Sequence, residues 1–235
     1  MRIGGQHLGQ AISRLPIAGQ NRAASSKSGA DKVVGDITAH GGKAIAVQGS
    51  VAKKADIERL FAETKKAFGQ PDILVNNAGI YEFGPLEQIS EESFHKQFNT
   101  NVLGLILTTQ EALKHFNGDG GSIINISSVV GVNPLPGATV YSATKAAVDA
   151  VTKSLARELG PKKVRVNSIN PGMIETEGVH AAGFLETELP KQVIAQTPLG
   201  RIGQPQDVAT VATFLASPDS GWITGETFLV SGGYR

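Results

Sequence analysis

Residues 122–159 read SIINISSVVGVNPLPGATVYSATKAAVDAVTKSLAREL and join a short apolar run to a long helical pattern. The run Ser122–Ser127 is nearly continuously aliphatic, as expected of a strand that is buried on both faces of a sheet. From Tyr141 to Leu159 the apolar residues recur at helical spacing. A buried strand followed by a helix is the repeating unit of a parallel sheet covered by helices. The stretch therefore predicts an α/β fold.

The same alternation extends in both directions from about residue 44. The other strands that we expect are Ala44–Val47, Asp72–Asn76, Val164–Asn170 and Thr227–Ser231, and the other helices are Ala55–Phe68, Ser93–Phe116 and Gln206–Leu215. No internal repeat, low-complexity tract or linker interrupts the pattern. We therefore expect residues 1–235 to form a single domain with a doubly wound parallel sheet of the Rossmann type.

The first 30 residues depart from this pattern. Such a fold normally opens with a buried strand, but only Met1, Arg2 and Ile3 precede the first glycine. The segment Gly9–Leu15 could be the first helix, and Pro16–Ser28 contains no apolar run long enough to predict a second strand. The first strand is thus expected to be short or missing, because the chain either lacks part of a nucleotide-binding unit or builds it unusually.

Composition excludes several classes of protein. With 22 basic and 21 acidic residues the formal net charge is +1, which argues against nucleic acid as a partner. There is no cysteine, so disulfides, thiolate metal sites and a cysteine nucleophile are excluded. No apolar stretch approaches the roughly 20 residues that span a bilayer, and no secretory apolar region follows Arg2. We expect a cytoplasmic protein, although the lack of carboxylates in residues 1–30 would also suit a transit peptide.

Tyr141 and Lys145 lie four residues apart at the start of a predicted helix, so their side chains share one face. A fixed ammonium favours the phenolate and is expected to lower the pKa of the tyrosine, which could then act as general acid and base. The pairing taken alone is also a common accident on helices.

Two polar groups follow predicted strands at the sheet edge where such folds place ligands. Ser127 and Ser128 end the strand 13 residues before Tyr141, and a hydroxyl there could donate to a substrate oxygen. The segment Asn76–Gly79 offers small and amide side chains after the preceding strand, where a flat ring could approach the backbone. Both groups would also serve as ordinary turns.

Taken together, these residues resemble the short-chain dehydrogenase/reductase family in its compact form. The resemblance covers about residues 30–235 and rests on Asn76-Asn77-Ala78-Gly79, Asn101-Val102-Leu103-Gly104, Ser128, Tyr141-x-x-x-Lys145, Asn170-Pro171-Gly172 and Ser231-Gly232-Gly233. It implies a Rossmann-type domain that transfers hydride between a nicotinamide cofactor and a carbonyl or alcohol.

The resemblance also implies roles for individual residues. Tyr141 matches the catalytic acid/base, Ser128 the group that polarises the substrate oxygen, and Lys145 the residue that assists the tyrosine and binds the nicotinamide ribose. Asn101 matches the fourth catalytic member, which holds a water in the proton relay and locally disturbs its helix. The further positions expected to contact the cofactor are Gly9, Arg22, Ser25, Ser26, Ser50, Val51, Asn77, Ala78, Gly79, Pro171, Gly172, Ile174 and Thr176.

The N-terminal glycine motif of the family is not matched, since aligning its end with Gly9 puts His7 at the middle glycine and Ile3 at the first. A side chain at a glycine position obstructs close backbone approach to phosphate. Ser50 also replaces an aspartate that commonly contacts adenine. A cofactor-deficient, non-catalytic relative that keeps the fold is therefore the alternative to an enzyme.

The expected cofactor is NADP, with NAD as an alternative. Counting about 20 residues from Gly9 leads to 21–28, where two cations and three serines occur without a carboxylate, which suits a ribose 2′-phosphate. The alternative is an ordinary polar surface loop.

The expected partner is a small carbonyl or alcohol substrate, for which Tyr81, Phe83, Leu135 and Val179 could line a pocket. Helices that are apolar on more than one stripe predict a homo-oligomer, a tetramer by resemblance or a dimer.

Overall fold

The computed structural model describes residues 17–19, 23–176, 179–180, 186 and 188–235. All of the strands in these described residues run parallel. Strand β1 (Ile17–Gly19) pairs with β2 (Ala46–Gln48), and a second sheet has the order β3 (Ile73–Asn76), β4 (Gly121–Ile126), β5 (Val164–Pro171) and β6 (Thr227–Val230). Within the described residues no ladder joins the two sheets.

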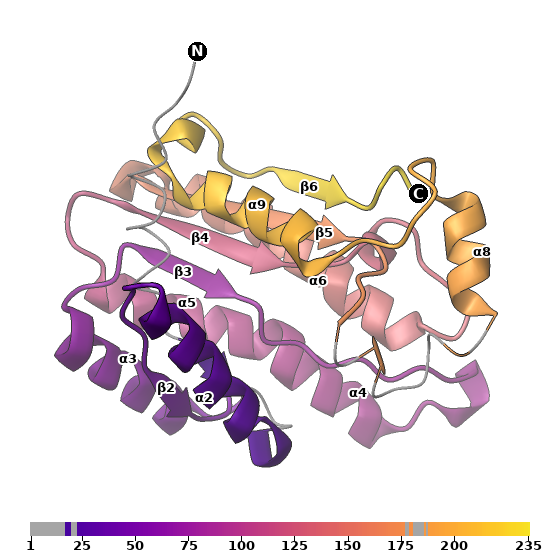
Figure 1. Ribbon diagram of the computed structural model, residues 1–235, viewed down its shortest axis with the longest axis horizontal. Helices are drawn as coiled ribbons and strands as arrows, with labels where there is room; N and C mark the ends of the chain where they lie inside the picture. Colours follow the sequence, from indigo (N-terminus) through magenta and orange to yellow (C-terminus); the bar gives the residue numbers. More distant parts are fainter. Residues whose placement is uncertain (1–16, 20–22, 177–178, 181–185, 187) are drawn as a thin grey trace.

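Helices cover both faces, as the apolar strands require (Figure 1). Helices α2 (Ala23–Ala39) and α9 (Pro205–Ala216) lie in front of the strands, and α3 (Lys54–Phe68), α5 (Gly104–His115) and α6 (Thr139–Leu159) lie behind them. Helices α4 (Glu91–Phe98) and α8 (Leu189–Gln196) stand beyond the end toward which the strands point. The α/β arrangement predicted from the sequence is therefore confirmed.

Helices pack against both faces of the central strand β4, which explains why Ile123 and Ile124 are apolar at successive positions. Ile123 packs with Leu159 and Val166 on the α6 side, whereas Ile124 packs with Ile169 and Leu215 on the α9 side. Neighbouring residues of a strand point to opposite faces, so a strand with helices on both sides needs apolar residues at successive positions. All six of these side chains are buried.

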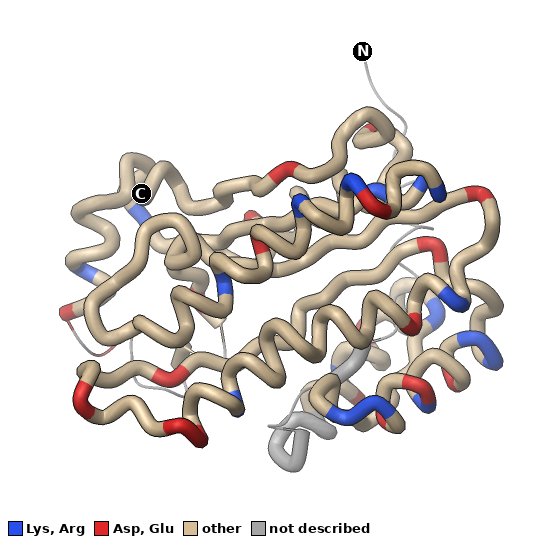
Figure 2. Tube along the Cα trace, turned by 180° about the vertical axis from the view of Figure 1, so that it is seen from behind, with Lys and Arg blue, Asp and Glu red and all other residues tan. Residues whose placement is uncertain are grey.

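Local signals set the helix ends. Ser90 caps α4, because its hydroxyl accepts a hydrogen bond from the Ser93 N–H at 3.1 Å. Pro205 occupies the first turn of α9, where Asp207 accepts from the Gln204 N–H at 2.7 Å. Basic and acidic residues are interspersed along these helices (Figure 2), in keeping with the formal net charge of +1.

Three expectations need correction. The helix predicted over Ser93–Phe116 is divided by a π-helical turn, Asn99–Leu103, between α4 and α5. A strand does occur within Pro16–Ser28, because Ile17–Gly19 pairs with β2, although three residues are too few to give a periodic signal. The alternative of a polar surface loop over residues 21–28 is also wrong from Ala23 onward, where α2 begins. The helix predicted over Gly9–Leu15 lies outside the described residues.

Candidate active site

Ser127 and Ser128 stand at the carboxyl end of the central strand β4. The Ser127 hydroxyl is buried and donates to the Lys145 main-chain oxygen at 3.0 Å, which fixes the strand end to α6. Ser128 caps a short 3-10 helix, Val129–Gly131, by accepting from the Val130 N–H at 3.3 Å. Both serines thus have turn-forming roles, and Ser128 also has its hydroxyl at the ligand-binding edge of the sheet.

Helix α6 brings Tyr141 and Lys145 to the same place. The Ser128 side chain hydrogen-bonds the Tyr141 hydroxyl, and the Lys145 Nζ lies 5.7 Å from the centre of the Tyr141 ring. The four-residue spacing on one helix face and the end of β4 together produce this cluster. The structure therefore joins three of the four predicted catalytic residues.

The acid–base properties of this cluster are dominated by burial. Burial raises the pKa of Tyr141 to about 12; the Ser128 hydrogen bond opposes this rise, and neighbouring Tyr81 adds to it. The expected lowering of the tyrosine pKa by Lys145 is therefore wrong for the protein without ligands. Burial lowers the pKa of Lys145 to about 8, against the opposing effect of the Asp149 carboxylate. At neutral pH the phenol carries its proton, and the amine is mainly an ammonium.

Lys145 has hydrogen-bonding capacity left for a ligand. Its side chain is 5% exposed, and Nζ donates to the Ile126 main-chain oxygen at 2.9 Å, while an ammonium has three donors. Gly79 faces this group: a Cβ there would lie 3.4 Å from Lys145 Nζ and 3.5 Å from Asn101 Oδ1. A buried ammonium with free donors, beside a backbone that carries no side chain, fits the ribose and flat ring of a nicotinamide nucleotide.

Asn101 lies in the π-helical turn, where the resemblance implies a disturbed helix. Its amide group donates to the Ile80 main-chain oxygen at 2.8 Å and to Thr144 Oγ1 at 3.0 Å, and its oxygen accepts from the Ile80 N–H at 2.8 Å. Asn101 thus ties the segment after β3 to α6 beside the Tyr141–Lys145 pair. Of the other predicted residues in that segment, Asn77 is exposed and Ala78 is partly buried.

Two predicted cofactor positions lie in the loop after β2: Ser50, where the family commonly has an adenine contact, and Val51. Asp56 accepts a hydrogen bond from the Ser50 N–H at 2.9 Å, and this bond together with Arg59 holds the pKa of Asp56 below its usual value. Val51 packs against Gly104, where a Cβ would lie 2.8 Å from Val51 Cγ2. The loop is therefore fixed against the start of α5, on the side of Asn101.

Pro171 ends β5 and leads into a second backbone approach. A Cβ on Gly172 would lie 3.0 Å from the Cα of Ser231, so the chain segments after β5 and β6 touch here. Ile174 forms a parallel bridge with Gly203, whereas Thr176 is exposed. Gly172 and Ile174 also line a cavity of about 330 Å³ with Val193, Val230 and further residues.

The remaining predicted cofactor positions are near the N-terminus. Gly9 and Arg22 lie outside the described residues. The backbone places Ser25 and Ser26 in the first turn of α2. The first turn of a helix presents N–H groups that favour anions, so this placement is compatible with phosphate.

Aromatic side chains surround the Tyr141 ring. The ring centres of Tyr81 and Phe83 each lie 5.9 Å from that of Tyr141, in edge-on arrangements. Phe83 also lines a cavity of about 260 Å³ together with Gln97 and other residues. Two of the residues predicted to line a substrate pocket thus do lie beside the candidate acid.

Sequence reasoning missed a row of polar side chains beneath the site. Asn76, Asn125 and Ser168 are in register on β3, β4 and β5, and they bond to Thr109, Thr152 and Asp149 on the helices behind. All six are buried. Polar residues inside otherwise apolar strands are the signal that could have revealed this row.

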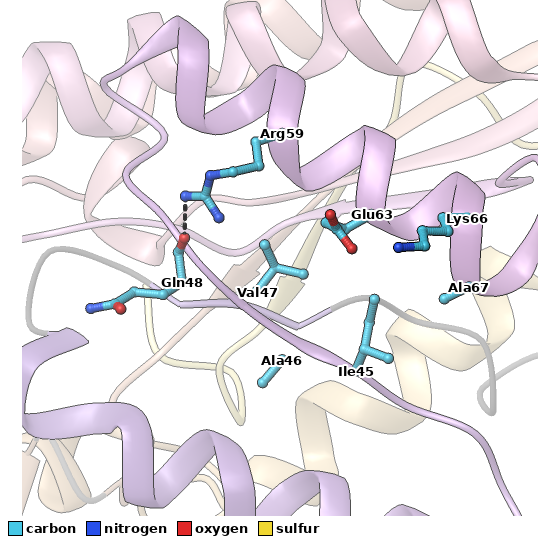
Figure 3. A pocket seen from close by; sticks show the side chains of 8 residues that line it. All are labelled: Ile45, Ala46, Val47, Gln48, Arg59, Glu63, Lys66 and Ala67. Carbon is cyan, nitrogen blue, oxygen red and sulfur yellow. Dashed lines mark hydrogen bonds between the residues drawn. The ribbon is translucent and has the colours of Figure 1, made fainter.

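A further cavity, of about 520 Å³, lies between β2 and α3 (Figure 3). Ile45 and Val47 line it from the strand side, and Arg59, Glu63 and Lys66 from the helix. None of its lining residues belongs to the predicted catalytic or cofactor set, so no ligand is assigned to it. Across the described part of the chain, no three His, Asp or Glu residues gather as a metal site and no helix could span a membrane.

Comparisons with known proteins agree with this geometry. A family model described as "Enoyl-(Acyl carrier protein) reductase" matches residues 11–235. An uncharacterized oxidoreductase of Methylorubrum extorquens is 52% identical over 212 residues, which cover 90% of this chain and 85% of the relative.

Two solved structures share the fold. A short-chain dehydrogenase/reductase from Serratia marcescens superposes with a TM-score of 0.85 at 31% identity, covering 96% of this chain and 92% of the other. A blue fluorescent protein from a metagenomic library, solved in complex with NADPH, gives a TM-score of 0.85 at 32% identity, covering 97% and 93%. With the family model, the relative and the site geometry in agreement, the chain belongs to the short-chain dehydrogenase/reductase family of oxidoreductases.

Proposed function

We propose that the protein is an NADP-dependent oxidoreductase that interconverts a carbonyl compound and its secondary alcohol. The observation that carries the proposal is the convergence of Ser128, Tyr141 and Lys145 at the carboxyl end of β4, with Asn101 beside them. Each of the four side chains is held by partners from a different part of the fold. This arrangement suits proton donation to an oxygen that gains negative charge.

In the direction of reduction, Ser128 donates a hydrogen bond to the substrate carbonyl oxygen and Tyr141 donates the proton. A phenol with a pKa of about 12 is protonated at neutral pH, so it is ready to act as the acid. The bound nicotinamide supplies the hydride. Lys145 holds the nicotinamide ribose with its free donors and stabilises the developing phenolate, and Asn101 supports the proton relay.

The proposed cofactor groove runs along the carboxyl edge of the sheets. Gly79 and Lys145 would hold the nicotinamide ribose, Gly172 and Ile174 the nicotinamide, and Thr176 the phosphates. Asn77 and Ala78 extend the groove toward Ser50 and Val51, which contact adenine. Asp56 already engages the Ser50 N–H, so this contact would use the Ser50 hydroxyl, which accepts from the Ala52 N–H at 3.3 Å and keeps its own proton to donate.

The preference for NADP over NAD rests on the other end of the groove. Arg22, Ser25 and Ser26 supply the 2′-phosphate contacts in the proposal, and Gly9 is the glycine of the pyrophosphate turn. The first helical turn that contains Ser25 and Ser26 supports this assignment, as does the NADPH complex of a structural neighbour. A ratio of kcat/KM for NADPH and NADH below one would overturn it.

The proposed substrates of this protein are similar to those of 3-oxoacyl-thioester reductases and of sugar or cyclic-alcohol dehydrogenases. The Tyr81 and Phe83 rings support an apolar group next to the reacting carbonyl. A panel of a 3-oxoacyl thioester, a cyclic ketone and an enoyl thioester tests the reaction class, with Tyr141→Phe as the matched variant. The variant should lose about 10²- to 10⁴-fold in kcat on the carbonyl substrates while still binding the coenzyme.

A second candidate is a cofactor-deficient relative that keeps the fold without catalysis. The departures at Ile3 and His7 from the family's glycine motif favour it. Thermal unfolding with NADPH distinguishes the two, because a ligand at about 100 times its dissociation constant stabilises a protein by about 2.7 kcal/mol. No shift with NADPH or NADH would support the second candidate.

We also propose a homo-oligomer, a tetramer or alternatively a dimer, made of single-domain subunits that act in the cytoplasm. Phe94 and Leu103 support the assembly, because these large apolar side chains are 40% and 43% exposed on α4 and the π-helical turn. Exposed apolar groups on neighbouring elements suit contact with a second subunit.

A further inference from the structure

Asp149 is a buried carboxylate that the proposed reaction does not use. It lies on α6, four residues beyond Lys145 and eight beyond Tyr141, and it is 6% exposed. That spacing places it on the helix face that carries both residues. An ionised carboxylate away from water is costly unless it is well paired, so its contacts indicate what it does.

Both oxygens of Asp149 accept hydrogen bonds from strand β5. Ser168 Oγ donates to Oδ1 at 3.0 Å, and Asn170 Nδ2 donates to Oδ2 at 2.7 Å. The second proton of Asn170 Nδ2 goes to the Ser128 main-chain oxygen at 3.2 Å. A line of hydrogen bonds thus runs from Asp149 through Asn170 to the residue whose hydroxyl meets Tyr141.

The same carboxylate acts on Lys145 by its charge. Lys145 is as deeply buried as Asp149. The charge of the Asp149 carboxylate, on the same helix, raises the pKa of the lysine. The groups that face Asp149 from β5, Ser168 and Asn170, are neutral. Asp149 therefore combines a geometric link to Ser128 with an electrostatic link to Lys145.

We propose that Asp149 is a positioning residue of the active site, which fixes Ser128 through Asn170 and places a carboxylate on the helix face that carries Lys145. This inference rests on the proposed oxidoreductase function. A neighbouring pair shows what a purely structural bond looks like: Asn125 Nδ2 donates to Thr152 Oγ1 at 2.9 Å, also between the sheet and α6, and has no link to the reacting residues.

Asp149→Asn tests the charge. The amide can accept from Asn170 and donate to Ser168 Oγ, so both hydrogen bonds are retained while the charge is removed. An opposite charge close to a titrating group changes its pKa by about 1 to 3 units. We expect the alkaline limb of the kcat/KM profile for carbonyl reduction to move at least about one pH unit lower.

Asn170→Ala tests the link to Ser128. The space left by the amide admits water to Asp149, so the charge is kept while the Ser128 carbonyl is released. We expect kcat to fall about tenfold or more, because small displacements of reacting groups are costly, with the alkaline limb and the NADPH dissociation constant unchanged. Thr152→Val is the matched control, and it should lower the melting temperature without changing kcat or the pH profile.

The outcomes are distinct. An unmoved alkaline limb in Asp149→Asn or an unchanged kcat in Asn170→Ala would overturn the inference, and so would a Thr152→Val profile that shifts like that of Asp149→Asn. If Asp149→Asn fails to fold, Asn170→Ala decides alone. A wild-type protein that reduces no carbonyl with either coenzyme would instead overturn the proposed function.

Discussion

Replacing Lys145 with methionine should make the protein inactive and more stable at neutral pH. Burial lowers the pKa of Lys145 from its usual 10.5 to about 8. At 1.36 kcal/mol per pH unit, this fall means that the buried ammonium costs about 3 kcal/mol. Methionine keeps the stem without the charge, but it leaves the Ile126 carbonyl without its donor, which costs about 1 kcal/mol. The expected net gain at pH 7 is about 2 kcal/mol.

The stability difference between Lys145→Met and wild type should depend on pH. Between about pH 8 and 10.5 the unfolded chain holds a proton on Lys145 that the folded chain has released. Wild-type stability therefore rises with pH through this window, relative to a variant that lacks the group. The advantage of Lys145→Met should shrink by about 2 kcal/mol between pH 7 and 9.5.

Urea denaturation without coenzyme measures both effects. Circular dichroism is the suitable probe, because the single tryptophan, Trp222, is 100% exposed and its fluorescence would report little. Lys153→Met is the matched control: Lys153 is exposed on the same helix, and its replacement should change stability by less than about 0.5 kcal/mol. A Lys145→Met variant that is less stable than wild type at pH 7 would refute the reasoning.

The other predictions concern packing and assembly. Gly131→Ala places a Cβ 3.0 Å from the Ala146 nitrogen, which should push Ser128 away from α6 and lower kcat about tenfold without weakening NADPH binding in titrations. Gly104→Ala meets Val51 at 2.8 Å and should cost about 1 to 3 kcal/mol in urea unfolding, whereas Gly35→Ala, with nothing within 4 Å, should not destabilise. Light scattering should give a mass of at least two 24.6 kDa subunits, and a monomer at micromolar concentration would contradict the assembly.

Elements that depend on local signals were predictable. The apolar runs of β3, β4 and β6 stand out in the sequence, and in β4 the successive residues Ile123 and Ile124 pack against helices on opposite faces. The pairing of Tyr141 with Lys145 follows from helix periodicity alone, and Ser128 follows from the place where an apolar run stops.

Other features depended on contacts between distant segments. The π-helical turn at Asn99–Leu103 interrupts a pattern that is helical by periodicity, and Asn101 there is held by Ile80 and Thr144. Strand β1 has three residues and exists by its pairing with β2. Neither feature leaves a periodic trace, because the partners lie 21 to 43 positions away for Asn101 and on a separate strand for β1.

The acid–base behaviour of the site was also decided by tertiary structure. From the sequence, Lys145 was expected to lower the pKa of Tyr141, because the spacing fixes their proximity. The folded chain buries both groups, and burial raises the tyrosine pKa to about 12 and lowers the lysine pKa to about 8. Sequence spacing determines which groups meet, whereas the packing of α6 against β4 and β5 determines how much water they lose, and that loss controls their charge.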